Sequence, residues 1–180
     1  LLADQQDAIL TVINRASRIA SVEIRGDDAF GRHSQGGWSQ RRFQTRHEER
    51  RAHFARAVAE ETRKAIVEGD IDMLIVAGGD VMLNALKNEF HDEVNKRIIG
   101  TLNMDIHASY NDILEATQPL VIAREHEREL EAVKTLLDEV GAGNRGLVGI
   151  EDTLKALQFG QVMTLVMVAD FSEKGWADYG

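Results

Sequence analysis

Residues 31–56 read GRHSQGGWSQRRFQTRHEERRAHFAR, and the fold of the chain can be worked out from this stretch. It holds seven arginines and two glutamates, a net charge of +5, whereas the whole 180-residue chain carries −9 and the remainder therefore −14. A basic island in an acidic chain indicates one surface for a polyanion. Gly36 and Gly37 stand just ahead of Gln40, so a flexible turn and an amide side chain adjoin that surface.

The basic stretch runs into a predicted long helix. From about Trp38 to Glu68 there is no glycine or proline, and the residues favour helix. The second half carries a core-facing apolar stripe at helical spacing, made of Phe54, Val58, Ala59, Ala65 and Ile66. Between Arg41 and His53 only Phe43 and Ala52 are apolar, so this half should project into solvent, over about 20 Å at about 1.5 Å per residue. The glycines would then lie at its tip, the positive end of the helix dipole.

Two short runs rich in β-branched residues precede this helix. Ile9–Ile13 and Ile19–Ile24 are separated by the polar segment Asn14–Arg18, and they predict a hairpin. Gly26–Gly37 is polar, contains four glycines and has no apolar periodicity. It predicts a loop between the hairpin and the helix.

Strand and helix patterns alternate after the helix. Ile71–Ala77 predicts a buried strand, and Gly78-Gly79 turn the chain into a helix capped by Asp80 and running to about Phe90. A phosphate cradle at this turn is the alternative, but the spacing of the known glycine-rich phosphate motifs is absent. A further strand is expected near Arg97–Leu102. Together these elements predict an α/β domain over residues 1–104.

Residues 105–180 predict a second, smaller α/β domain. A helix is expected around Ser109–Thr117, and Pro119 kinks or restarts it. A second helix is expected to have an apolar face made of Leu130, Val133, Leu137 and Val140. A third helix is expected over Glu151–Leu157, ending at Gly160, and a buried strand over Val162–Val168. The chain starts without methionine and stops soon after this strand, so we expect this domain to be incomplete and the chain to be part of a longer one.

Composition excludes several classes of protein. Hydrophobic residues make up 43% and charged residues 28% of the chain, which is typical of a soluble globular protein. The lack of cysteine excludes disulfides and thiolate metal sites within the chain. The longest apolar run, Val162–Ala169, is too short to span a membrane, and no signal peptide is found, so a cytoplasmic location is expected. His47 and His53 are six positions apart, off one helix face, so no metal site and no cofactor are expected.

Three stretches, in the same order, resemble one family. GIEDTLKALQFGQVMTLVMV, residues 149–168, is similar to the start of the third domain of the eukaryotic and archaeal class 1 peptide chain release factors. Residues 31–60 resemble their catalytic loop and the arginine-rich helix after it, and IDMLIVAGGDVMLNAL, residues 71–86, resembles the next strand and helix. The resemblance implies a release-factor-type catalytic domain followed by a domain similar to the kink-turn-binding ribosomal protein fold.

One difference from the family's catalytic motif indicates a particular branch within the family. Family release factors carry Gly-Gly-Gln without interruption, whereas Trp38 and Ser39 separate Gly37 from Gln40 here. This Gly-Gly-x-Ser-Gln order is similar to a divergent branch of release-factor-like peptidyl-tRNA hydrolases of ribosome quality control. Nothing matches the stop-codon-reading first domain, so the resemblance implies rescue of stalled ribosomes. The implied partners are ribosomal RNA and peptidyl-tRNA, with no role for DNA or a membrane.

The resemblance also implies which residues form the site. The catalytic set is Gln40, Gly36, Gly37 and Ser39, and the RNA-binding set is Arg32, Arg41, Arg42, Arg46 and Arg50. Two other classes stay open. One is a non-catalytic ribosome- or RNA-binding factor of the Pelota type, although that type lacks the glutamine, so Gln40 favours hydrolysis. The other is a scaffold whose basic helix binds an acidic protein.

Overall fold

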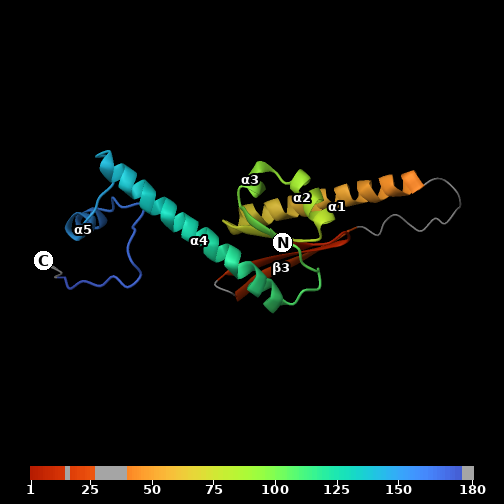
Figure 1. The fold of residues 1–180 in the computed structure, drawn as a ribbon, viewed down its shortest axis with the longest axis horizontal. Helices are drawn as coiled ribbons and strands as arrows, with labels where there is room; N and C mark the ends of the chain where they lie inside the picture. Colours follow the sequence, from red (N-terminus) through yellow and green to blue (C-terminus); the bar gives the residue numbers. More distant parts are fainter. Residues whose placement is uncertain (15–16, 27–39, 176–180) are drawn as a thin grey trace. The chain divides into compact units, whose positions relative to one another are not determined.

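The computed structural model describes residues 1–14, 17–26 and 40–175, and at residues 14, 17–19 and 40–46 it describes the backbone only (Figure 1). By its internal contacts the chain divides into two units, Leu1–Ile122 and Ala123–Gly180. The boundary falls within a long helix, and each unit is described separately below.

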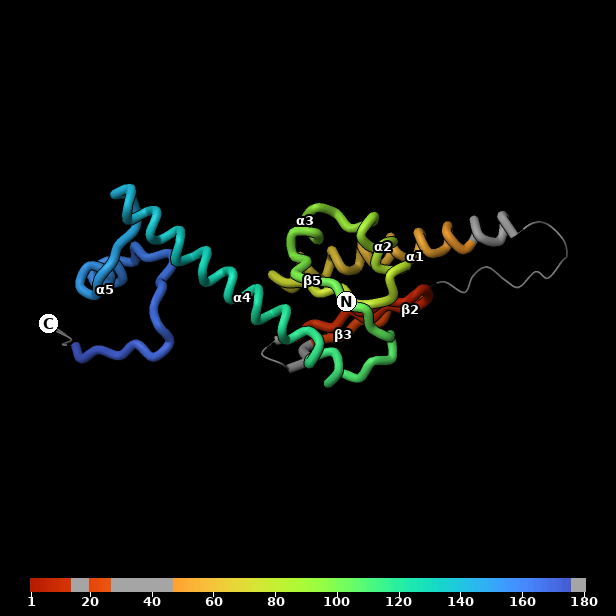
Figure 2. The backbone as a smooth tube through the Cα atoms, viewed as in Figure 1, coloured from red at the N-terminus to blue at the C-terminus, as the bar shows by residue number. Residues whose placement is uncertain are grey.

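The first unit is built on a mixed five-stranded sheet. Its strands are β1 (Leu2–Ala3), β2 (Asp7–Asn14), β3 (Ser17–Arg25), β4 (Leu74–Gly78) and β5 (Ile98–Leu102), in the order β3-β2-β1-β4-β5. The predicted hairpin is confirmed, since β2 and β3 are antiparallel and run side by side in Figure 2. The short strand β1 pairs antiparallel with β2 and parallel with β4, and β4 pairs parallel with β5. The two residues of β1 therefore join the hairpin to the parallel half of the sheet.

Five helices follow or separate these strands. They are α1 (Gln40–Gly69), α2 (Asp80–Glu89), α3 (Asp92–Asn95), α4 (Tyr110–Gly141) and α5 (Ile150–Gln158). The core lies where α1 and α2 pack on the sheet, and it includes Ala8, Val76, Phe54, Val58, Ile66, Met82 and Leu86. Of the stripe predicted on α1, Ala65 is only half-buried and the other four residues are buried, so the prediction is largely confirmed. Thr62 joins them, and its hydroxyl donates to the Val58 carbonyl at 2.7 Å.

The prediction that Asp80 caps α2 is wrong. Asp80 is the first residue of the helix, and the cap is Gly79, whose backbone is extended (φ −74°, ψ 151°). The Gly79 carbonyl accepts hydrogen bonds from the N–H groups of Met82 and Leu83 at 2.9 and 3.0 Å. Glycine fits this cap position almost as well as a polar residue, so the helix starts one residue earlier than the side-chain pattern indicates.

Gly78 is required by a close approach of two strands. Its φ is 153°, and a Cβ built on it would lie 2.1 Å from the carbonyl oxygen of Ala3 on β1. Backbone atoms of the neighbouring strand thus occupy the space beside Gly78. This geometry supports the interpretation of Gly78-Gly79 as a strand-to-helix turn, preferred above to a phosphate cradle.

The predicted restart of the helix at Pro119 is wrong, because α4 runs from Tyr110 to Gly141 with Pro119 inside it. The start is fixed by a reciprocal cap, in which the Asp112 N–H donates to the Ser109 hydroxyl and the Ser109 N–H to the Asp112 carboxylate, both at 3.2 Å. The proline removes one backbone hydrogen bond, at a cost of about 3 kcal/mol. Strong helix formers on both sides offset that cost.

In the second unit, one predicted helix is confirmed and one predicted strand is wrong. The predicted helix over residues 151–157 is α5, and Gly160 follows it with a φ of 65°. The predicted buried strand over residues 162–168 is wrong, since the segment is not a strand and is largely exposed, with Met163 98% accessible. A strand needs a neighbour for its backbone N–H and C=O groups, and the described residues beyond β5 contain no strand. The structure thus shows one α/β domain, and the predicted second one is not shown.

Candidate functional site

The candidate site begins at the start of α1. Gln40 is the first residue of α1 that the structure describes, since residues 27–39 lie outside the described part of the chain. It thus lies toward the N-terminal end of the helix, the positive end of the helix dipole. The predicted site residues Arg32, Gly36, Gly37 and Ser39 lie outside the described residues.

The first part of α1 extends beyond the sheet (Figure 1). Residues 47–50 are all exposed, and from residue 47 onward, where side chains are described, the first buried residue of the helix is Phe54. The helix therefore extends about 21 Å from Gln40 before it reaches the core. The predicted projection into solvent is confirmed for residues 47–50, where side chains are described.

The arginines predicted to bind RNA follow one another along this helix. Arg42, Arg46 and Arg50 are four residues apart, so their backbone positions share one side of α1. Arg41 lies in the first turn, and Arg50 is exposed. The fold thus places four of the five predicted arginines, together with Gln40, on one helix.

The last two arginines of the basic stretch have different surroundings. Arg51 is half-buried, and its enclosed Nε has no hydrogen-bond partner among the described residues. The Arg56 Nε donates to Glu89 Oε2 of α2 at 3.1 Å, so a carboxylate already compensates its charge. The sequence places all seven arginines in one island, whereas the structure gives these two specific surroundings within the protein: Arg51 is half-buried and Arg56 is paired with Glu89.

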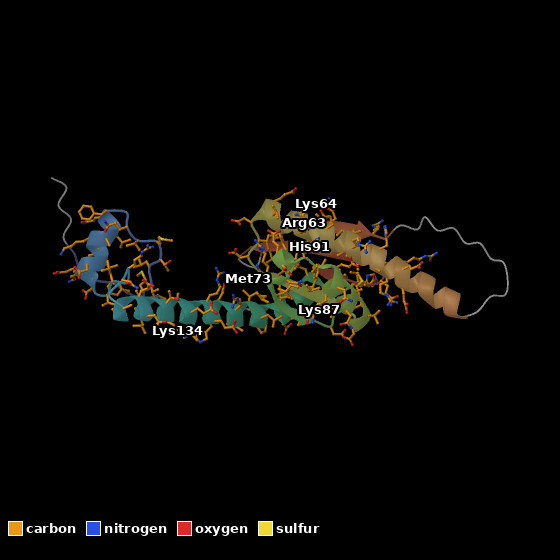
Figure 3. All side chains as sticks on the ribbon, turned by 90° about the horizontal axis from the view of Figure 1, so that it is seen from above. Arg63, Lys64, Met73, Lys87, His91 and Lys134 are labelled. Carbon is orange, nitrogen blue, oxygen red and sulfur yellow. The ribbon has the colours of Figure 1, made fainter. Side chains whose placement is uncertain are left out.

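A groove beside Arg56 is the second feature of this region. It has a volume of about 360 Å³ and is lined by Arg56, Ala59, Glu60, Asn88, Glu89, Phe90 and His91. The Arg63 guanidinium donates to Glu60 at 2.9 and 3.1 Å, which lowers the pKa of that carboxyl group. Figure 3 shows His91 close to Arg63 and Lys64 in projection. The two carboxylates here are each paired with a guanidinium group, Glu89 with Arg56 and Glu60 with Arg63, so these four groups carry no net positive charge to attract a phosphate. Sequence reasoning missed this groove because its residues come from separate elements.

Within residues 1–14, 17–26 and 40–175, no three histidine, aspartate or glutamate residues come together as ligands for a metal ion. No helix in the described part of the chain has the length and apolarity needed to cross a membrane.

Known proteins similar to this chain define its class. It is 24% identical over 163 residues to peptide chain release factor subunit 1 of Thermococcus onnurineus, covering 85% of this chain and 39% of that protein. It is 27% identical over 144 residues to the eukaryotic peptide chain release factor subunit 1 of Saccharomyces cerevisiae, covering 76% and 33%. The chain thus spans between a third and two fifths of the length of these relatives. It is a release-factor-like protein.

The family itself is shown by a match over two thirds of the chain. Residues 1–120 match bacterial archaeo-eukaryotic release factor family 10, and the chain belongs to this family. The match covers the sheet, α1 to α3 and the start of α4. The resemblance to the release factors noted in the sequence is thereby confirmed at the level of family and distant relatives.

Proposed function

We propose that this protein is a peptidyl-tRNA hydrolase that releases nascent peptides from stalled ribosomes. The observation that carries the proposal is the family match over residues 1–120, together with a helix that starts at Gln40 and projects from the core. The chain spans only part of its relatives' length, so its substrate and partners are inferred from the family. A ribosomal site implies action in the cytoplasm, on ribosomal RNA and peptidyl-tRNA, and the proposed reaction needs no cofactor.

The proposed reaction is the hydrolysis of an ester. The oxygen of a water molecule bonds to the peptide carbonyl carbon and gives up one proton. The bond from that carbon to the terminal ribose oxygen breaks, and the ribose oxygen takes up a proton to become a hydroxyl group. Gln40 positions the water or stabilises the developing oxyanion through its backbone N–H or its amide. Holding the water in place can lower the barrier by roughly 7–11 kcal/mol.

The residues around Gln40 have supporting roles in this proposal. Gly36 and Gly37 let the backbone enter a narrow RNA-lined site without Cβ clashes, and Ser39 completes the Ser-Gln pair. Arg32, Arg41, Arg42, Arg46 and Arg50 bind RNA phosphates and fix the approach of the loop.

The remainder of the chain has a proposed role as well. We propose that residues 1–104 form the catalytic domain and that residues 105–180 begin a domain similar to the kink-turn-binding ribosomal protein fold. The resemblance of residues 149–168 to the start of the third domain of the class 1 release factors supports this assignment.

Rescue and termination can be separated by the codon in the ribosomal A site. We expect the protein to release labelled peptide at similar rates from ribosomes stalled with an empty A site and with a stop codon. The reason is that the order Gly36-Gly37-Trp38-Ser39-Gln40 is similar to that of the divergent release-factor-like peptidyl-tRNA hydrolases of ribosome quality control. Purified ribosome–peptidyl-tRNA complexes that differ only in this codon provide the measurement. Release that depends on a stop codon would contradict the rescue function, and ribosome binding without release would leave a docking factor.

A further inference from the structure

The direction of the projecting helix is set at its base, where α1 meets α2. Phe54 is the first buried residue of the helix, and Arg56 follows two positions later. Arg56 bonds to Glu89 at the end of α2, a residue 33 positions away in the sequence. The other ion pairs described on α1, Arg63–Glu60 and Lys64–Glu61, join residues of the same helix. The Arg56–Glu89 bridge therefore ties α1 to a second element at the point where it leaves the core.

A small rotation at this base becomes a large displacement at the tip. Gln40 lies 16 residues before Arg56, which corresponds to about 24 Å along the helix. A change of about 5° in the helix direction would move Gln40 by about 2 Å over this length. A misplacement of about 1 Å can slow a reaction by about 100-fold, because catalysis by positioning depends on geometry.

We propose that Arg56 and Glu89 are positioning residues for the reaction at Gln40. Phe54 and Val58 pack in the core and fix one side of α1, and the Arg56–Glu89 ion pair links α1 to α2. The inference rests on the proposed function, because it concerns the placement of the proposed catalytic loop. It assigns to Arg56 a role other than phosphate binding, although Arg56 belongs to the basic stretch.

The exposure of the two side chains fits this role. The Glu89 side chain is 23% exposed and that of Arg56 is 70% exposed. The carboxylate is thus a partly enclosed anchor, and the guanidinium reaches it from the helix surface. An arginine that served RNA phosphates would be weakened by a neighbouring carboxylate, and the Glu89 carboxylate lies 3.1 Å from the Arg56 Nε.

The first test measures the helix direction without reference to activity. The chain has no cysteine, so Glu48→Cys on α1 and Asn84→Cys on α2 give two unique positions for spin labels, both exposed. Double electron–electron resonance then gives the distribution of distances between them. We expect Glu89→Arg to broaden or shift this distribution and the swapped pair Arg56→Glu/Glu89→Arg to restore it. Glu61→Gln is the matched control, because it removes an ion pair within α1 and should change nothing.

The second test measures peptide release at saturating protein, together with ribosome affinity. We expect Glu89→Arg to slow release about 3- to 10-fold at unchanged or tighter ribosome binding, and the swapped pair to recover most of the rate. An unchanged distance distribution in Glu89→Arg, or a broadened one with normal release, would overturn the inference. If the swapped pair does not recover the release rate, and its ribosome binding is weaker and depends less on salt than that of the wild type, Arg56 is instead a phosphate contact. A wild-type protein that releases no peptide would sink the proposed function and the catalytic role, while the distances would still decide whether the bridge directs the helix.

Discussion

Gly78 and Gly79 are adjacent in the chain, but only at Gly78 does the surrounding backbone require a glycine. A Cβ at Gly78 would meet the Ala3 carbonyl oxygen at 2.1 Å, whereas a Cβ at Gly79 would meet nothing within 4 Å. The first glycine is required by the contact between β1 and β4, and the second only caps a helix that lacks a side-chain cap. Sequence reasoning identified the turn, but not which glycine was replaceable, because the Ala3 carbonyl comes from a strand 75 positions away.

A pair of substitutions tests this difference. Gly78→Ala should lower the free energy of unfolding by on the order of 2–4 kcal/mol, because backbone atoms must move to admit the methyl group. Gly79→Ser should raise it only slightly, by about 0.3 kcal/mol, because the hydroxyl can accept from an N–H of the first turn of α2 but glycine is already a good cap residue. Denaturant unfolding of both variants beside the wild type gives the two values. Equal midpoints for the two variants would contradict the strand contact.

At the scale of the element, α1 combines two different surfaces in one helix. Its prediction over residues 38–68 agrees closely with Gln40–Gly69, because an uninterrupted run of helix formers and an apolar stripe are local signals. The Arg56–Glu89 bridge could not be predicted, since pairing between distant positions depends on the tertiary fold. The strand predicted at residues 162–168 failed for a related reason, because apolar composition does not supply a neighbouring strand.

The exposed half of α1 should bind RNA mainly through charge. Arg50→Ala should weaken ribosome binding, reduce the slope of log affinity against log salt by about 1, and leave release at saturation unchanged. The reason is that one phosphate contact is lost while Gln40 is untouched. Co-sedimentation with ribosomes at several salt concentrations measures the slope. Lys64→Ala is the control, because Lys64 is paired with Glu61 and lies outside the basic stretch. If both variants reduce the slope equally, ribosome binding depends on the overall charge of the protein and not on a defined arginine surface.

For the whole molecule, the sequence predicts two α/β domains, whereas the structure shows one, built on a mixed five-stranded sheet. The sheet order brings the hairpin, β1 and the parallel strands into one layer that supports α1, and the family match covers the same residues. The roles of Gly36, Gly37, Ser39 and Arg32 stay predictions, because these residues lie outside the described part of the chain. What the structure adds to the candidate site is that Gln40 belongs to α1, the helix that also carries Arg41, Arg42, Arg46 and Arg50.

The most direct test of the account is release of labelled nascent peptide from purified ribosome–peptidyl-tRNA complexes by the wild type and by Gln40→Ala. We expect the substitution to reduce the release rate by on the order of 100-fold or more, as expected when a positioning or oxyanion-binding group is lost. Ribosome binding should be retained, because the arginines of α1 are unchanged. Release by Gln40→Ala at the wild-type rate, with equal ribosome binding, would contradict the assignment of the chemistry to the start of α1.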